Sequence, residues 1–206
     1  MSAPVTAEDW DQLFSHPNHV YGYRPNEFLK GPSRLFRPGS RILCVCDGEG
    51  RNGVWLAEQG HDVVSLDFSA VALEKARRLA AERGVSIETW QVDLAEWVHH
   101  PDPELPWDAV VVIFAHLPSA LRRAVAATVT RQASPGAVLV LEAFTPAQPA
   151  LGSGGPTDPD LLVTRAGVTE EWAGWRPDVR LIERRLFEGM AHQGLASVVQ
   201  VLGLRA

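Results

Sequence analysis

Cysteine is scarce in this sequence of 206 residues, which contains only Cys44 and Cys46. A disulfide between residues this close cannot join distant parts of a fold, and no second cysteine pair is present to complete a zinc site. Side chains two residues apart on an extended strand face the same side, so we expect both thiols to stay reduced and to pack on one side of the core. The sequence therefore predicts neither a disulfide-stabilised scaffold nor a metal site.

Long hydrophobic runs are also absent. The longest one, residues 109–115, is far shorter than the ~20 residues that cross a bilayer. Residues 1–14 carry Glu8, Asp9 and Asp11 and lack the apolar stretch of a secretion signal. We therefore expect a cytoplasmic protein with no membrane partner.

Basic residues are in the minority, because 19 Lys and Arg face 25 Asp and Glu and the formal net charge is -6. Nucleic-acid binding depends on cations that neutralise phosphates, so the composition argues against a nucleic-acid partner and favours a small-molecule substrate. Hydrophobic residues make up 46% of the chain and charged residues 21%, which is the balance of a globular protein with an ordinary core. The sequence leaves the oligomeric state open.

Short apolar runs alternate regularly with amphipathic segments along the chain. This alternation predicts βαβ units, in which a parallel sheet carries helices on both faces. The last two runs are joined by a short turn, so they must be antiparallel neighbours. We expect an α/β fold with a seven-stranded sheet, parallel except for its C-terminal strand pair. The predicted strands are 41–46, 62–66, 86–91, 108–114, 137–144, 179–188 and 191–204, and the predicted helices are 6–15, 25–35, 51–59, 69–84, 118–133 and 169–175.

No internal repeat or linker divides the chain, so we expect one domain over residues 1–206. Residues 1–38 would form a helical and loop region outside the sheet, placed as a lid. We expect Trp172 and Trp175 to be exposed, at an interface or in a lid. The arginines near the final strands are expected on a solvated face, with binding of an anionic substrate as the alternative; they are Arg176, Arg180, Arg184 and Arg185.

The sharpest local signal is the motif DGEGRNG at residues 47–53, between the first predicted strand and the helix after it. Glycines allow a tight turn and let the backbone approach a ligand, and the free amides at a helix start favour anionic or polar groups. Gly48, Gly50 and Gly53 match the G-x-G-x-x-G spacing of nucleotide-binding turns. For this motif alone, an ordinary strand-to-helix turn is the alternative.

Two aspartates follow the next two predicted strands. Asp67 ends the second strand, where a carboxylate can accept hydrogen bonds from both hydroxyls of a ribose. Asp93 follows the third strand, at the edge where the exocyclic amine of an adenine would lie. Together with the glycine turn they predict an adenosine-containing cofactor. NAD and S-adenosylmethionine (SAM) both fit, but the chain lacks a Tyr-x-x-x-Lys pair and ends in an antiparallel strand pair, which favours SAM.

Five motifs carry a family resemblance: GEGRN at 48–52, LAEQGH at 56–61, LDFS at 66–69, VDL at 92–94 and SPG at 134–136. With them, essentially the whole chain resembles the class I SAM-dependent methyltransferases, and more closely their tellurite-resistance and thiopurine methyltransferase-like branch. The resemblance implies a Rossmann-like sheet and S-adenosyl-L-methionine as cofactor, with the methionine part on the glycine turn, the ribose on the second-strand acid and the adenine after the third strand. The cofactor residues it implies are Asp47, Gly48, Glu49, Gly50, Arg51, Asp67, Phe68, Asp93, Leu94 and Phe114.

The chain departs from the family pattern at the end of its first strand. The common pattern has an acid at the position of Cys44, and often a glycine at the position of Cys46. Asp47 and Glu49 are therefore the candidates for contact with the cofactor's ammonium group.

A sulfonium methyl group is already activated, so the protein has to place the acceptor in line and exclude water rather than supply a covalent nucleophile. We expect the acceptor pocket between the N-terminal segment, the end of the fourth strand and the loop after the fifth, including residues 152–156. His116 is a candidate acid–base or orienting group, with a helix cap as the alternative. The resemblance adds His192, which aligns with a histidine of the tellurite-resistance relatives. The candidate substrate residues are Tyr21, Tyr23, Arg24, Asn26 and Phe28.

These observations predict a SAM-dependent methyltransferase that acts on a small-molecule acceptor. The branch resemblance implies a thiol or another chalcogen species, whereas oxygen and nitrogen acceptors fit the residues equally well. Two alternatives remain open: a non-catalytic module that binds SAM or its product S-adenosylhomocysteine (SAH), and a small NAD-binding oxidoreductase.

Overall fold

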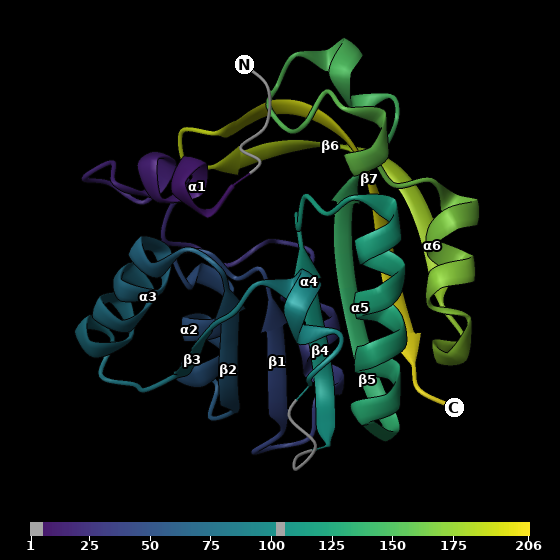
Figure 1. Cartoon of the computed structure of the whole chain (residues 1–206), viewed down its shortest axis with the longest axis horizontal. Helices are drawn as coiled ribbons and strands as arrows, with labels where there is room; N and C mark the ends of the chain where they lie inside the picture. The colour runs from purple at the N-terminus through teal and green to yellow at the C-terminus, as the bar shows by residue number, and fades with distance from the viewer. Residues whose placement is uncertain (1–5, 102–105) are drawn as a thin grey trace.

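Seven strands form one mixed sheet in the computed structural model (Figure 1), which describes residues 6–101 and 106–206. Residues 1–5 of the predicted N-terminal region lie outside the described part. The strands are β1 (Arg41–Val45), β2 (Asp62–Asp67), β3 (Glu88–Gln91), β4 (Trp107–Ile113), β5 (Ala133–Phe144), β6 (Asp178–Glu188) and β7 (His192–Leu204). Their order is β3-β2-β1-β4-β5-β7-β6, and only β7 runs antiparallel to its neighbours. The predicted α/β fold with a C-terminal antiparallel pair is confirmed.

Helices cover both faces of this sheet (Figure 1). Thr6 and Asp9 form a capping box at the first helix, and Ser69 caps the third through the Ala72 amide. Within the described residues, no helix combines the length and apolarity of a membrane span. The α-helices are α1 (Ala7–Phe14), α2 (Arg51–Glu58), α3 (Ala70–Glu82), α4 (Leu94–Trp97), α5 (Ser119–Gln132) and α6 (Arg165–Glu171), and the 3-10 helices are η1 (Pro32–Leu35), η2 (Gln148–Leu151), η3 (Pro159–Leu161) and η4 (Ala173–Trp175).

The alternation of side chains along β1 divides the core in two. Leu43 and Val45 pack with residues of α4, α5 and α6, whereas Ile42 and Cys44 pack on the other face. Cys46 joins the cluster of Leu43 and Val45, so the prediction that both thiols share one side is wrong. The reason is local: β1 ends at Val45, and Cys46 takes a left-handed backbone conformation with φ 54°. Both cysteines are free.

Two predicted helices differ from those in the structure: one is shorter and the other begins earlier. Only η1 forms within 25–35, since proline lacks a donor and restricts the residue before it, here Gly31 ahead of Pro32. Where the sequence predicts one helix over 169–175, the structure has α6 followed by η4. Trp172 and Trp175 are 1% and 0% exposed, so the prediction of exposed indoles is wrong. They complete the core under α6, and the Trp175 indole donates a hydrogen bond to Thr130 on α5 at 2.7 Å.

The N-terminal segment lies across the carboxyl ends of the parallel strands, beside the turn of the β6–β7 hairpin (Figure 1). The carboxylate of Asp11 on α1 accepts hydrogen bonds from the Ser69 hydroxyl at 2.5 Å and from the Val71 amide at 3.2 Å. The Met190 amide in the hairpin turn donates to the Val20 carbonyl at 2.9 Å. Two distant parts of the chain are thereby joined above one edge of the sheet.

Gly50 sets how closely α2 packs on α3. A Cβ at this position would lie 2.6 Å from Cβ of Ala76, and the backbone has φ 81°. Gly60, after α2, has a similar φ of 88° but nothing within 4 Å of the Cβ position. We expect Gly60→Ala to lower the free energy of unfolding by about 1 kcal/mol through strain alone, and Gly50→Ala by about 2 kcal/mol more because it also overpacks the helix contact. Urea denaturation of both variants measures the difference, and equal losses would show that α2 and α3 separate freely.

Candidate active site

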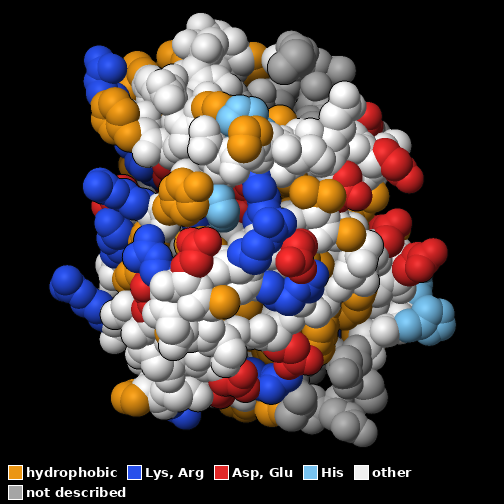
Figure 2. All heavy atoms as spheres, turned by 90° about the vertical axis from the view of Figure 1, so that its left-hand side faces the viewer, with side chains coloured by type: hydrophobic (Ala, Val, Ile, Leu, Met, Phe, Trp, Pro, Cys, Tyr) orange, Lys and Arg blue, Asp and Glu red, His pale blue; other side chains and the backbone are white. Residues whose placement is uncertain are grey.

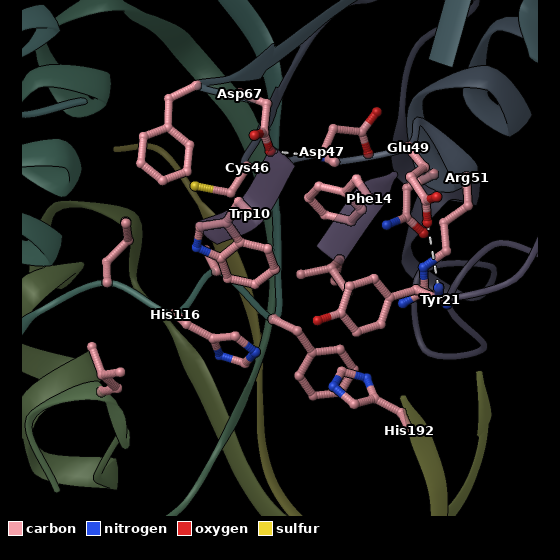
Figure 3. Close-up of a pocket in the computed structure, with 18 of the residues that line it drawn as sticks. Trp10, Phe14, Tyr21, Cys46, Asp47, Glu49, Arg51, Asp67, His116 and His192 are labelled. Carbon is pink, nitrogen blue, oxygen red and sulfur yellow. Dashed lines mark hydrogen bonds between the residues drawn. The ribbon is translucent and has the colours of Figure 1, made fainter. Parts of the chain in front are cut away.

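A cavity of about 350 Å³ lies at the carboxyl edge of the parallel strands. The glycine turn after β1 forms one wall, and side chains of α1 and the segment after it form another (Figure 3). This volume is at the lower end of the range for small-molecule sites. Rings dominate the lining, and they belong to Trp10, Phe14, Tyr21, Phe68, Phe114, His116 and His192.

Asp67 is fixed at the cavity by the glycine turn itself. Its carboxylate accepts hydrogen bonds from the amides of Gly48 at 2.9 Å and of Ser69 at 3.0 Å. Burial raises the pKa of Asp67, although these backbone donors oppose the shift. A Cβ at Gly48 would lie 3.3 Å from the ring of Phe14, a tight contact that the ring would have to shift to relieve. The turn thus presents bare backbone and one carboxylate to the same space.

Asp47 also lines the cavity, but its oxygens already serve the start of α2. They accept hydrogen bonds from the Ser65 hydroxyl at 2.6 Å and from the Gly53 amide at 3.2 Å. Burial raises the pKa of Asp47 to about 7 against the effect of these donors. Asp47 therefore fixes the turn, and both of its oxygens accept hydrogen bonds from the protein, as those of Asp67 do.

Glu49 ties the N-terminal segment to the glycine turn. Its carboxylate accepts hydrogen bonds from Nζ of Lys75 at 2.6 Å and from the Val20 amide at 2.7 Å. The same Lys75 ammonium donates to the carbonyls of His16 and Asn18 at 2.7 and 3.1 Å. The segment that closes the cavity is thus held by a buried ion pair.

Two predicted cofactor residues do not line the cavity. Gly50 faces α3, and Leu94 is buried in the core under α4. Asp93 does line it, while one carboxylate oxygen accepts from the Ala95 amide at 2.8 Å and caps α4. The predicted cofactor residues that the structure gathers around the cavity are Asp47, Gly48, Glu49, Arg51, Asp67, Phe68, Asp93 and Phe114.

Only one of the five predicted substrate residues, Tyr21, lines the cavity. The chain turns at Gly22, with φ 75°, where a Cβ would lie 3.1 Å from the amide nitrogen of Gly189 in the hairpin turn. The chain then leaves the cavity, so the other four predicted substrate residues lie outside it. The four outside the cavity are Tyr23, Arg24, Asn26 and Phe28.

A buried cluster of charges lies behind the cavity, and it corrects the prediction that Arg184 is solvated. Its guanidinium donates to Glu142 at 2.5 Å and to Glu188 at 3.0 Å. Glu188 also pairs with Arg51 at 2.6 Å. The Asn26 amide donates to Glu142 at 2.6 Å and to Glu188 at 3.0 Å. These contacts join α2, β5, β6 and the N-terminal segment, whereas the other three arginines of that prediction are exposed: Arg176, Arg180 and Arg185.

Both predicted histidines line the cavity, and neither carries a charge at neutral pH. Burial, reinforced by His192, lowers the pKa of His116 to about 3. Burial also lowers the pKa of His192, whose ring lies 4.7 Å from that of Tyr21 and 4.9 Å from that of Phe114 between centroids. In the described part of the chain, no cluster of His, Cys, Asp or Glu is arranged to hold a metal ion.

Several lining residues were not predicted. Trp10 and Phe14 on α1 stack at 5.4 Å between ring centroids, and Trp10 also stacks on His116 at 6.1 Å. The apolar stripe of this helix could have identified them, because the helix lies outside the sheet and its stripe needs a partner. The predicted loop 152–156 stays outside the cavity. The lining residues that the prediction omitted include Trp10, Phe14, Cys46, Leu121, Asp158 and Leu161.

Comparison with known proteins agrees with this geometry. Residues 42–136, from β1 through the glycine turn to the start of β5, match the family described as "Methyltransferase domain". Over these residues the chain is similar to a methyltransferase domain. It is 30% identical over 135 residues to a 2-heptyl-1-hydroxyquinolin-4(1H)-one methyltransferase of Mycobacteroides abscessus, an alignment that covers 65% of this chain and 59% of the relative. The chain spans less than two thirds of the length of the curated relatives it matches, and shorter matches include methyltransferases of ribosomal RNA, transfer RNA and glycine or sarcosine.

Solved structures agree with the fold of this chain. A protein studied in the conversion of a disulfide bond into a thioacetal group during echinomycin biosynthesis superposes with a TM-score of 0.72, at 20% identity over 97% of this chain and 91% of that one. TehB from Haemophilus influenzae superposes with a TM-score of 0.70, at 14% identity over 86% of this chain and 61% of that one. TehB is one of several such neighbours, so the finer assignment to the tellurite-resistance branch stays a prediction. Other neighbours were solved with SAM or SAH bound.

The side of the cavity that contains Asp67 fits an adenosine cofactor in chemical terms. Carboxylates of Asp67 and Asp93 can accept from hydroxyl and amine groups, and the glycine turn leaves the backbone at Gly48 accessible from the cavity. The cavity therefore offers the hydrogen-bond acceptors and the backbone approach that an adenosine cofactor such as SAM requires.

Asp47→Asn tests how Asp47 is held. The folded-state pKa of about 7 lies above the ordinary value of 3.8, so the folded wild type keeps a proton that the unfolded chain has lost, and it loses stability as pH rises between these values. Asparagine does not titrate. We therefore expect the stability advantage of wild type over Asp47→Asn to shrink by about 2 kcal/mol between pH 5 and pH 8. Urea unfolding at both pH values measures it, and a constant difference would mean that Asp47 is ionised in the folded protein throughout.

Proposed function

We propose that this protein transfers the methyl group of SAM to a small, uncharged acceptor bound against the aromatic wall of the cavity. The observation that carries the proposal is the division of the cavity lining. Asp67 lies on one side of the cavity and the rings of His116 and His192 lie on the other (Figure 3), and Gly48 and Asp93 line the cavity as well.

The proposed cofactor contacts follow from this lining. The backbone of the glycine turn at Gly48 would receive the methionine part, Asp67 the ribose hydroxyls, and Asp93 with the Phe68 ring the adenine. When bound, SAM supplies a methyl carbon bonded to a positively charged sulfur. An acceptor's electron pair can attack this carbon, and the sulfur leaves. The protein's own task is to orient the acceptor and to keep water out, and the rings of Trp10 and Phe14 are placed to exclude water.

The acceptor side of the cavity is poor in free charge. Arg51 is the one basic side chain among the described lining residues, and Glu188 pairs with it. Both histidines are neutral at pH 7 because burial lowers their pKa values. An anionic acceptor would therefore find no unpaired cation, which supports an uncharged one. A thiol or other chalcogen species fits this environment, as does a flat aromatic hydroxyl compound of the kind named for the Mycobacteroides relative.

Surface charge supports a small acceptor over a nucleic acid. The formal net charge is -6. On the face shown in Figure 2, acidic and basic side chains are interspersed across the middle of the molecule. A phosphate backbone is bound best by a continuous basic surface.

Calorimetric titration with SAH tests the cofactor site. We expect micromolar binding to wild type and at least about tenfold weaker binding to Asp67→Asn, because an amide replaces a charged acceptor. Asp62→Asn is the matched control, since Asp62 is exposed at the other end of β2 and pairs with Arg41 at 2.9 Å. NADH serves as the control ligand. Binding of NADH without SAH would contradict the proposal and favour the oxidoreductase alternative.

Methyl transfer is then measured with SAM and a panel of dithiothreitol, 4-nitrothiophenol, 8-hydroxyquinoline, aniline and a transfer RNA. We expect turnover with an uncharged thiol or hydroxyl compound and none with the RNA. Turnover of the RNA alone would overturn the acceptor class. Tight SAH binding without turnover of any acceptor would favour the non-catalytic module.

A further inference from the structure

β6 forms an edge of the sheet that lacks most of the usual protection against pairing with another strand. It has 11 residues and follows β7 in an unbroken register from Asp178 to Glu188, and within the described residues β7 is its only neighbouring strand. Proteins block such edges with short strands, lysine, proline or bulges, because an edge exposes a row of backbone donors and acceptors. The other edge strand, β3, is short, with four residues. β6 contains neither lysine nor proline, so its backbone is open to a further strand.

One face of β6 presents apolar and charged side chains in a symmetric order. Side chains two residues apart on a strand lie on the same face, and along this face the order is apolar, acidic, basic, apolar: Leu181, Glu183, Arg185 and Phe187. Leu181 is 51% exposed and Phe187 is 81% exposed. Within the described residues, Glu183 and Arg185 are exposed and form no hydrogen bond or ion pair. This order becomes its own complement when a second copy of the strand is turned end to end.

We propose that two copies of this chain pair through β6, with the two strands antiparallel and related by a two-fold axis at Arg184. In this register each Glu183 lies opposite Arg185 of the second copy, and each Leu181 lies opposite the second copy's Phe187. Opposite charges and apolar pairs directly across two strands stabilise a sheet. The sheets of the two copies would join into one continuous sheet across the axis.

The charges on β6 select this register over the neighbouring ones. A two-fold axis keeps the same face of the strand on the same side in both copies, so the axis must pass through a residue rather than between two. An axis at Glu183 would place two glutamates opposite each other, and an axis at Arg185 would do so with two arginines. Like charges directly opposite are destabilising. On the other face Arg184 meets its own copy, but its guanidinium is turned inward to Glu142 and Glu188.

A groove beside the start of β6 fits the same pairing. Its volume is about 450 Å³, and its apolar lining includes Phe28, Leu35 and Leu202. Asp178 also lines this groove, and the proposed register brings the second copy's hairpin turn, with Met190, to Asp178. The Met190 side chain is 53% exposed, and exposed apolar side chains that gather in one region mark interaction surfaces. The pairing would therefore cover apolar side chains at both ends of the strand as well as along it.

Analytical ultracentrifugation of the full chain tests the proposal and needs neither substrate nor cofactor. Because association follows mass action, we expect wild type to pass from one copy to two between about 1 and 200 µM. No larger species should form, since a two-fold contact closes on itself. Glu183→Arg and Arg185→Glu should each weaken the dimer at least about tenfold, because each places like charges opposite each other twice. Glu82→Arg, exposed on α3 near the other edge of the sheet, is the matched control for the change in charge and should leave the dimer unchanged.

A mixture of the two charge variants tests the register itself. One copy then carries two basic side chains at positions 183 and 185, and the other carries two acidic ones. The mixture should therefore form a mixed dimer, although neither variant pairs well with itself. The double variant Glu183→Arg/Arg185→Glu should dimerise like wild type for the same reason. Both positions are exposed, so circular dichroism should show that every variant keeps the wild-type fold.

Three results would overturn the proposal. The first is a wild type that stays a single copy at about 200 µM, which would leave the β6 edge to a strand from another protein. The second is a dimer that both charge variants leave intact, since that dimer would use another surface. The third is a mixture of the variants that fails to restore the dimer that each of them has lost.

Discussion

The ion pair between Arg51 and Glu188 joins residues 137 positions apart in the sequence. Arg51 begins α2 at the glycine turn, and Glu188 ends β6, so the pair fixes the C-terminal hairpin against the cofactor edge of the sheet. Removal of Glu188 would leave the buried Arg51 without its carboxylate, a kind of loss that costs about 3–5 kcal/mol, whereas removal of Arg51 would leave Glu188 paired with Arg184. The cavity wall that contains His192 is built on this contact.

The cluster behind the cavity also explains why the lining itself can be so poor in free charge. Two arginines and two glutamates neutralise one another there, with Gln200 donating to Glu142 at 2.6 Å. Charges that would otherwise face a ligand are used to hold α2, β5 and β6 together. The aromatic rings in front are left to determine what the cavity accepts.

Sequence reasoning located the part of this site that local rules determine. Gly48 and Asp67 follow successive parallel strands, and the carboxyl ends of such strands meet at one edge, so their proximity follows from the fold class alone. Asn26 and Arg184 could not be placed in this way. Their partners lie 116 and 42 residues away in the sequence. The sequence of β6 taken alone predicts that its arginines are exposed to solvent. Only the three-dimensional register of β6 on β7 turns Arg184 inward, toward β5.

Cys44 occupies the first-strand position at which the common family pattern has an acid, and the nearby acids Asp47 and Glu49 lie in the turn that follows. Cys44 is fully packed on the face of the sheet opposite Leu43, so nothing at its position reaches the cavity. Asp47 and Glu49 do reach it, but their oxygens hold α2 and the N-terminal segment. Acidic side chains here thus stabilise the walls of the site. The backbone at Gly48 lines the same cavity, although its amide already donates to Asp67 at 2.9 Å.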